Sequence, residues 1–150
     1  MRASGKWDLQ YEHIDTQDEL RLFDVAFIDA NRGIASGLLT SRKSERVRPV
    51  NLVTTNGKTW TVVQTKKACQ DLFALPQGIL FAACEDGIYR SEEMGKDWAR
   101  LAKLKNVTRV WFVSPLRGFA IGSEKSFYET SNGGKSWSAV KTNPDRTTSK

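Results

Sequence analysis

The chain has 150 residues, of which 39% are hydrophobic and 27% are charged, and its formal net charge is +6. This length suits one domain with a buried core, and the absence of any apolar run of about 18 residues predicts that no segment spans a membrane. The positive charge favours acidic partners through long-range attraction, but most lysines recur once per repeat in turns, which argues against a specific nucleic-acid surface.

The first residues carry a positive charge without the apolar stretch of a secretory signal. We predict no signal peptide in this chain, so that either the protein stays inside the cell or its true start lies elsewhere. Residues 7–13 are predicted to form a leading strand. They begin at the end of Ser4-Gly5-Lys6-Trp7, a degenerate copy of the turn that recurs later in the chain. His13 is the sole histidine, but no nucleophile motif lies near it, and we expect an exposed or backbone-bonded side chain rather than Ser-His or Cys-His catalysis.

An acidic connection, Asp15-Thr16-Gln17-Asp18-Glu19, comes next. Its oxygens could hold a cation, yet it lacks the Gly and the bidentate-Glu spacing of a calcium loop. Two cysteines and one distant histidine are too few for a zinc site. We therefore predict no metal, no cofactor and no catalytic residue in this chain.

The main signal is an internal repeat. Gly57-Lys58-Thr59-Trp60 recurs as Gly95-Lys96-Asp97-Trp98 and as Gly134-Lys135-Ser136-Trp137, with the tryptophans 38 and 39 residues apart. A second shared element precedes each copy, for example residues 27–37 and 112–122. A period near 40 residues predicts one supersecondary unit per repeat.

Each unit reads as four short strands separated by turns. In the last unit we expect strands at 108–113, 118–122, 126–130 and 136–141. Four antiparallel strands per period of about 40 residues are typical of a propeller blade. The predicted fold is therefore all-β, an incomplete β-propeller of about three blades at 20–66, 67–105 and 106–142, with a leading strand at 7–13 and a disordered tail at 143–150.

The turn before each tryptophan needs residues that tolerate positive φ and a side chain that satisfies free backbone N–H groups. These turns resemble the Asp-box of BNR-repeat proteins, with Asn or Glu in place of Asp and with the first copy one residue short, which predicts a tighter hairpin there. The resemblance implies a structural role for the box residues, which are Thr54, Asn56, Gly57, Trp60, Ser91, Glu93, Gly95, Trp98, Thr130, Asn132, Gly134 and Trp137.

Among Asp-box proteins, the segment 23–33 followed by 54–60 looks most like the photosystem II assembly and stability factors and their bacterial relatives. That resemblance covers residues 7–141 and implies a non-catalytic propeller that binds a protein, in a group often exported from the cytoplasm. The alternative is a fragment of a sialidase-like glycoside hydrolase, inactive by itself, because three blades cannot enclose its pocket. A closed propeller has about four to eight blades, so we also expect a fragment of a longer chain or self-association through the open blade edges.

Residues that do not repeat are the better candidates for function. Tyr89 and Tyr128 share one phase of the repeat, as do Arg32 and Arg117, and we expect these four to be structural. The insertion at 38–50 does not repeat, and it is either a solvated loop or a contact loop for an acidic partner. The candidate partner-binding residues on it are Arg42, Lys43, Arg46 and Arg48.

The two cysteines, Cys69 and Cys84, flank a hairpin bent at Pro76-Gln77. If that turn has two residues, the cysteines lie opposite each other, close enough for a disulfide. Two cysteines without a signal peptide are more often free and buried. Both states remain open at this point.

Overall fold

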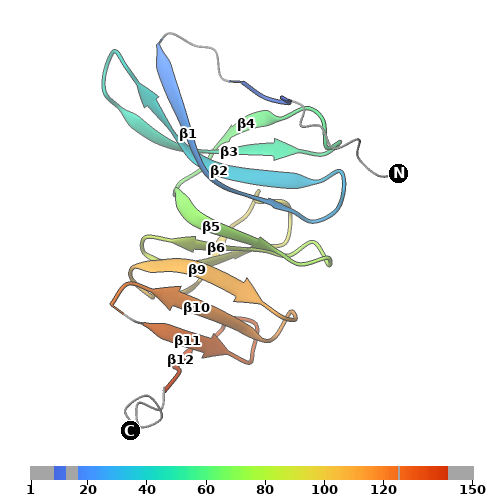
Figure 1. The fold of residues 1–150 in the computed structure, drawn as a ribbon, viewed down its shortest axis with the longest axis vertical. Coiled ribbons are helices and arrows are strands. Elements are labelled where there is room, and N and C mark those ends of the chain that lie inside the picture. The colour runs from blue at the N-terminus through green and yellow to red at the C-terminus, as the bar shows by residue number, and fades with distance from the viewer. Residues whose placement is uncertain (1–8, 13–16, 125, 142–150) are drawn as a thin grey trace, which may run out of the picture.

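The computed structural model describes residues 9–12, 17–124 and 126–141, which form three four-stranded antiparallel sheets (Figure 1). In every sheet each strand pairs with the next one along the chain. The first sheet contains β1 (Asp18–Phe27), β2 (Gly33–Ser41), β3 (Val47–Thr54) and β4 (Thr61–Gln64). The second contains β5 (Cys69–Ala74), β6 (Leu80–Cys84), β7 (Gly87–Ser91) and β8 (Ala99–Ala102). The third contains β9 (Val107–Phe112), β10 (Gly118–Gly122), β11 (Phe127–Thr130) and β12 (Ser138–Ala139).

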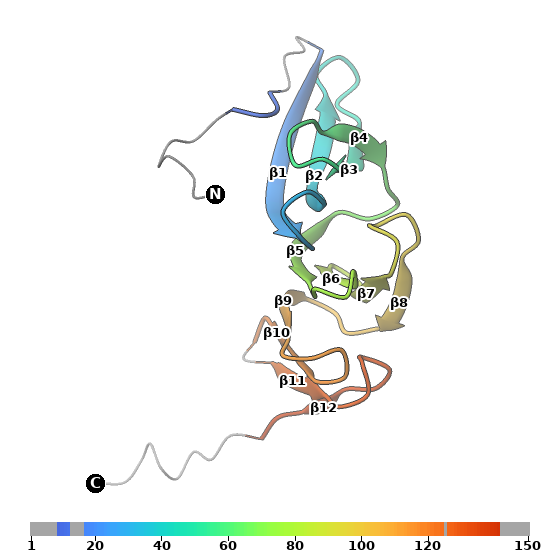
Figure 2. The ribbon, with the colours of Figure 1, turned by 90° about the vertical axis from the view of Figure 1, so that its right-hand side faces the viewer.

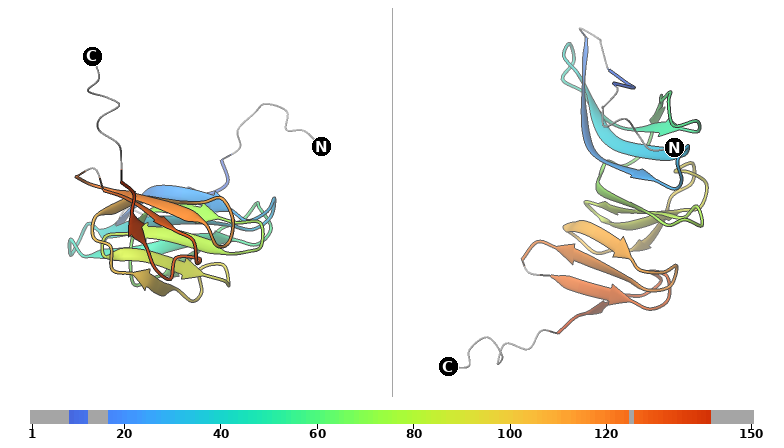
Figure 3. Two further views of the ribbon diagram at one scale, coloured as in Figure 1. Left: turned by 90° about the horizontal axis from the view of Figure 1, so that it is seen from below. Right: turned by 45° about the vertical axis from the view of Figure 1, so that its right-hand side comes forward.

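The sheets lie face to face in a stack, and Figure 3 (left) looks along that stack. The first strands β1, β5 and β9 lie along one side of it, whereas β4, β8 and β12 lie along the other (Figure 2). Contacts between β1 and β5 and between β5 and β9 join consecutive sheets. This is the arrangement of propeller blades around an axis, and the predicted all-β class of stacked four-stranded units is confirmed.

The strand bounds follow the repeat closely in the last unit. The strand expected at 118–122 is β10, and the one expected at 108–113 is displaced by one residue as β9. The last strand is much shorter than expected, since Ser136 N–H is bonded to Asn132 Oδ1 and belongs to the preceding turn. Residues 9–12 of the predicted leading strand are not in a strand. The rest of that segment, with His13, and the predicted disordered tail lie outside the described residues.

The middle sheet has a buried strand because it is covered on both faces. All five residues of β6 are buried. Leu80 and Ala82 pack toward the first sheet, while Phe81 and Ala83 pack toward the third. This explains the continuous apolar run of β6, which alternating polar residues would interrupt in a strand with one solvated face.

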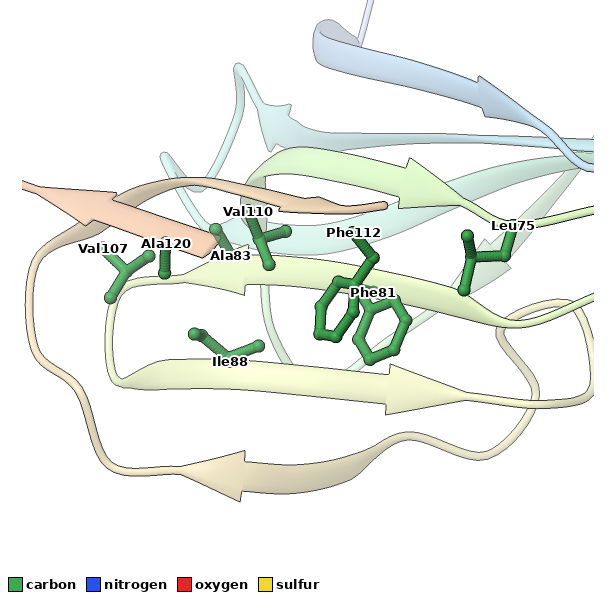
Figure 4. Close-up of a cluster of buried hydrophobic side chains, with 8 residues drawn as sticks. All are labelled: Leu75, Phe81, Ala83, Ile88, Val107, Val110, Phe112 and Ala120. Carbon is green, nitrogen blue, oxygen red and sulfur yellow. The ribbon is translucent and has the colours of Figure 1, made fainter. Parts of the chain in front are cut away.

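The interface between the second and third sheets is a cluster of buried apolar side chains (Figure 4). The rings of Phe81 and Phe112 stack with their centroids 3.6 Å apart and their planes 11° apart. Gly118 lies against this stack, where a Cβ atom would come within 2.6 Å of the Phe112 ring. The aromatic pair therefore requires a glycine at the start of β10.

Each first strand contains a β-bulge at the same place. The register shifts by one residue at Phe23 in β1, at Gln70 in β5 and at Thr108 in β9. A bulge changes the direction of the next side chain. The residues that follow are Asp24, Asp71 and Arg109.

A disulfide joins Cys69 and Cys84, and the free-thiol alternative is therefore wrong. The turn between their strands is longer than two residues, since Ala74 is opposite Leu80. The bulge at Gln70 then shifts the register by one and brings the two cysteines opposite each other. Cys84 is 1% exposed and Cys69 is 9% exposed, so burial and pairing occur together.

Candidate functional site

The predicted insertion is a long β-hairpin rather than a loop. It consists mostly of β2 and β3, which have 9 and 8 residues, whereas the corresponding β6 and β7 have 5 each. Only residues 42–46 form its tip. Ser41 N–H donates to the carbonyl of Arg46 at 2.8 Å, and Arg42 N–H donates to the carbonyl of Gln17 at 2.7 Å, so the tip is tied to its own strands and to the start of β1.

The four candidate partner-binding residues are not equivalent. Arg42, Lys43 and Arg46 are exposed and form no ion pair with any of the described residues. Arg48 is half-buried in β3, and its Nη2 lies 3.3 Å from Asp18 Oδ2. Its charge is therefore offset within the protein, and the tip carries the three accessible cations.

The third box turn has a complete side-chain network. Thr130 Oγ1 accepts the N–H of Gly134 at 3.0 Å and donates to Asn132 Oδ1 at 2.9 Å. Asn132 Oδ1 also accepts the N–H of Ser136 at 3.0 Å, and the indole N–H of Trp137 donates to the carbonyl of Gly134 at 2.9 Å. These bonds close the hairpin and hold the tryptophan against it.

The first box turn repeats this network in a shorter form. Thr54 Oγ1 accepts the N–H of Gly57 at 3.0 Å, and Asn56 Oδ1 accepts the N–H of Thr59 at 2.9 Å. The turn has one residue with positive φ, Gly57, where the third has two, Gly133 and Gly134. Its tryptophan, Trp60, donates instead to Gln10 at 3.0 Å.

The second box turn lacks the side-chain hydrogen bond that Asn56 and Asn132 accept in the other two turns. Ser91 Oγ accepts the N–H of Gly95 at 2.9 Å, as the threonines do in the other two turns. The carboxylate of Glu93 forms no hydrogen bond within the described part of the chain. Met94 and Gly95 take the two positive-φ positions, with φ of 58° and 82°. The name Asp-box for these turns stays a prediction.

Two aspartates on the first strands link consecutive sheets. Asp24 Oδ2 accepts the N–H of Leu72 in β5 at 2.7 Å, and Asp71 Oδ2 accepts the N–H of Val110 in β9 at 2.9 Å. Burial raises the pKa of Asp71, the Val110 N–H opposes this, and the neighbouring Asp24 carboxylate adds to the rise. Sequence reasoning missed this pair, although both residues occupy one phase of the repeat.

Tyr89 lies in a charged network on the second sheet. Its hydroxyl donates to both carboxylate oxygens of Asp86 at 3.0 Å, and Asp86 also pairs with Lys67 at 3.1 Å and with Arg100 at 3.3 Å. Burial would raise the pKa of Asp86, but hydrogen bonds from Lys67 and Tyr89 hold it below its usual value. Burial and the Asp86 contact raise the pKa of Tyr89, so the hydroxyl is held in its neutral, donating form.

The two repeated arginines also contact neighbours in their own units. Arg32 Nε lies 2.8 Å from Asp29 Oδ2, and the guanidinium of Arg117 lies 5.4 Å from the ring centre of Phe119. Backbone N–H groups of Asn31 and the Arg32 side chain hold the pKa of Asp29 below its usual value. No group of three or more His, Cys, Asp or Glu that could hold a metal occurs among residues 9–12, 17–124 and 126–141.

The outer face of the third sheet is open. It carries exposed Trp111, Ile121 and Phe127. An apolar hollow of about 750 Å³ is lined by these residues together with Asp71, Leu72 and Phe73 of β5. Arg109 lies at this face, at the position that Asp24 and Asp71 hold in the other sheets. Within the described residues, no helix is long and apolar enough to cross a membrane.

The chain matches no protein-family model and no curated protein. Among solved structures it is similar to "YCF48 bound to D1 peptide", with 18% identity, a TM-score of 0.59, and coverage of 88% of this chain and 44% of that one. It has the fold of part of a YCF48 propeller. Against YCF48 from Cyanidioschyzon merolae the identity is 24%, the TM-score is 0.63, and the coverage is 86% of this chain and 39% of that one.

These likenesses concern the fold. The expected similarity to photosystem II assembly factors is confirmed at that level, and the chain spans less than half the length of either YCF48 structure.

Proposed function

We propose that this protein is a non-catalytic propeller module that binds an acidic segment of another protein through the β2–β3 hairpin tip. The observation that carries the proposal is the cluster of three exposed cations, Arg42, Lys43 and Arg46, on a hairpin whose tip is tied to the start of β1. A surface turn on a rigid scaffold is a common binding element. The YCF48 structure bound to D1 peptide supports peptide binding by a protein of this fold.

The distribution of unpaired charges indicates which part of the hairpin an acidic partner would contact. The tip carries one carboxylate, Glu45, against its three cations, whereas Arg48 is already paired with Asp18. Exposed charges attract over roughly a Debye length, about 8–10 Å in physiological salt. We therefore expect an acidic partner to bind at the tip and Arg48 to act as a support for the hairpin.

The experiment is a titration of a short fluorescent poly-glutamate peptide, followed by anisotropy at low and at high salt. The variant R42E/K43E/R46E should weaken binding by about ten-fold or more. The control K58E/K103E/K135E changes the formal charge equally on exposed lysines elsewhere and should keep most of the affinity. Equal losses in both variants would reduce the effect to net charge and would overturn the proposal.

The second candidate, a fragment of a glycoside hydrolase, is tested with the same preparation. Hydrolysis of an aryl sialoside or aryl glycoside by the purified chain would favour it. Tyr89 recurs as Tyr128 at the same phase of the repeat, which supports the non-catalytic proposal, because a residue that each unit needs is more often structural.

A further inference from the structure

A partly open cavity of about 570 Å³ lies between the first and second sheets. Its walls are the second-sheet-facing side of β2 and β3, the connection from β4 to β5, and the box turn of the second sheet with Trp98. Small-molecule sites in proteins commonly have volumes of about 300–1,000 Å³. The size therefore suits a small ligand.

Polar residues line this cavity at positions where the interface between the second and third sheets has apolar residues. The two sheets can be aligned on the residue that follows the bulge in each first strand. In the first sheet this residue, Asp24, is opposite Ser36, which is opposite Asn51. In the second sheet Asp71 is opposite Ala83, which is opposite Ile88. Ala83 and Ile88 are fully buried in the apolar cluster against the third sheet, whereas Ser36 and Asn51 line the cavity.

The connections between the sheets differ in the same way. Lys66 lies three residues before Cys69, and Leu104 lies three residues before Val107, at equivalent places ahead of β5 and β9. Leu104 packs against the apolar cluster. Lys66 is exposed and lines the cavity. Three polar replacements thus meet in one place.

Asn51 is the residue that points to a ligand. It is 6% exposed, and its side-chain amide forms no hydrogen bond with any residue that the structure describes. A buried amide that lacks a hydrogen-bond partner destabilises the folded state. Ser36, by contrast, accepts the N–H of Cys69 at 3.2 Å.

The charges at the cavity favour an anion. Its lining includes Lys66, Lys67 and Lys96 but a single carboxylate, Asp97. Lys67 pairs with Asp86, while Lys66 and Lys96 have no ion pair in the described parts of the chain. The Trp98 ring and the apolar wall suit an organic body rather than a bare ion.

We propose that this cavity binds a small organic carboxylate, with the carboxylate held by Lys66 and Lys96 and a hydroxyl or amide group of the ligand hydrogen-bonded to Asn51. This site is separate from the hairpin tip. Its occupation would supply a hydrogen-bond partner for Asn51 and fill the space that Ile88 and Leu104 fill at the next interface.

The test is an NMR titration of the labelled full chain with L-malate, up to about 20 mM, a concentration that saturates a site with a millimolar Kd. Saturable shifts of the Asn51 side-chain amide and the Trp98 indole N–H support the proposal. The neutral diamide of malate should give none. No shift, or equal shifts with the diamide or with inorganic phosphate, would mean that the cavity holds only water or any compact ion, and would overturn it.

Variants separate the site from general charge. The variant N51I/K66L installs the residues of the next interface, and it should abolish malate binding while raising the melting temperature. N51D keeps the cavity but adds repulsion, and it should weaken binding by about ten-fold. K103L removes an equivalent charge outside the cavity and should bind normally. Unchanged binding in N51I/K66L and N51D would contradict the proposal.

Discussion

The carboxylate of Asp24 accepts the backbone N–H of Leu72 at 2.7 Å, so a side chain of β1 satisfies a backbone donor on the free edge of β5. A first strand pairs on one side only and would otherwise leave such donors open. The other oxygen of Asp24 accepts the N–H of Val25 at 2.8 Å. One side chain thereby stabilises the bulge of its own strand and the contact to the next sheet.

The Asp24→Ala variant should be less stable, because Leu72 N–H loses its acceptor. We expect a loss of about 1–3 kcal/mol in the free energy of unfolding, measured by urea denaturation followed by circular dichroism. Asp24→Asn keeps an acceptor oxygen and should lose less. Equal losses in the two variants would show that the hydrogen bond to Leu72 contributes little.

Asp71 should make stability fall as pH rises. Its pKa is raised in the folded protein by burial and by Asp24, so the folded state binds this proton more tightly than the unfolded state does. The contribution of Asp71 is therefore present below its unfolded pKa and lost as pH rises through its folded pKa. Asp71→Asn should gain stability relative to the parent between about pH 3 and pH 7.

Asp29 is the control for that pH series, because its pKa is shifted in the opposite direction to that of Asp71. Its pKa is lowered by the N–H groups of Asn31 and Arg32 and by the Arg32 side chain, so its contribution is present above the unfolded pKa and is lost as pH falls through the folded one. Asp29→Asn should therefore cost more at pH 7 than at low pH. Parallel pH profiles for the two variants would contradict the assignment of Asp71.

The disulfide should stabilise the second sheet without defining it. The other sheets place Leu22 opposite Gly37 and Val107 opposite Gly122 at the same position, so the variant C69V/C84G copies a pair that the fold already uses. Closing a chain segment of 15 residues is worth about 3 kcal/mol. The variant should fold with a lower melting temperature, and a loss of all β-structure by circular dichroism would refute this.

The box turns should differ in their tolerance of mutation. Asn132→Ala removes the acceptor of Ser136 N–H and should cost about 1 kcal/mol. Glu93→Ala removes a side chain without a hydrogen bond in the described structure, and it should change stability by less than about 0.5 kcal/mol. Thermal unfolding of both variants tests the difference, and similar losses would mean that the second turn uses its acidic residue after all.

The spacing of Trp60, Trp98 and Trp137 was sufficient to predict three units of four strands. It succeeded because each turn must carry positive-φ residues and an acceptor at fixed positions, which leaves a local mark in the sequence. The bulges left no such mark. They follow from how first strands meet across sheets, and only the recurrence of Asp24 and Asp71 at one phase could have indicated them.

The candidate sites also combine features that the sequence indicates with features that only the structure reveals. The cations of the β2–β3 hairpin were visible in the sequence, but the pairing of Arg48 with Asp18 depends on the register between distant strands. Asn51 was not singled out, because an asparagine in a strand looks ordinary until its position is aligned with Ile88. Non-repetition is a useful guide to function only when the register is known.

The most direct test of the account is residue-resolved hydrogen exchange of the full chain under native conditions. Stacked sheets require the amides of β6 (Leu80–Cys84), together with those of Leu72 and Val110, to exchange slowest, because β6 is covered on both faces and the other two donate to carboxylates of the preceding sheet. Asp24→Ala should release Leu72 selectively. If β6 exchanged as fast as the outer strands β4 and β8, the sheets would not be stacked as blades and the account would be wrong.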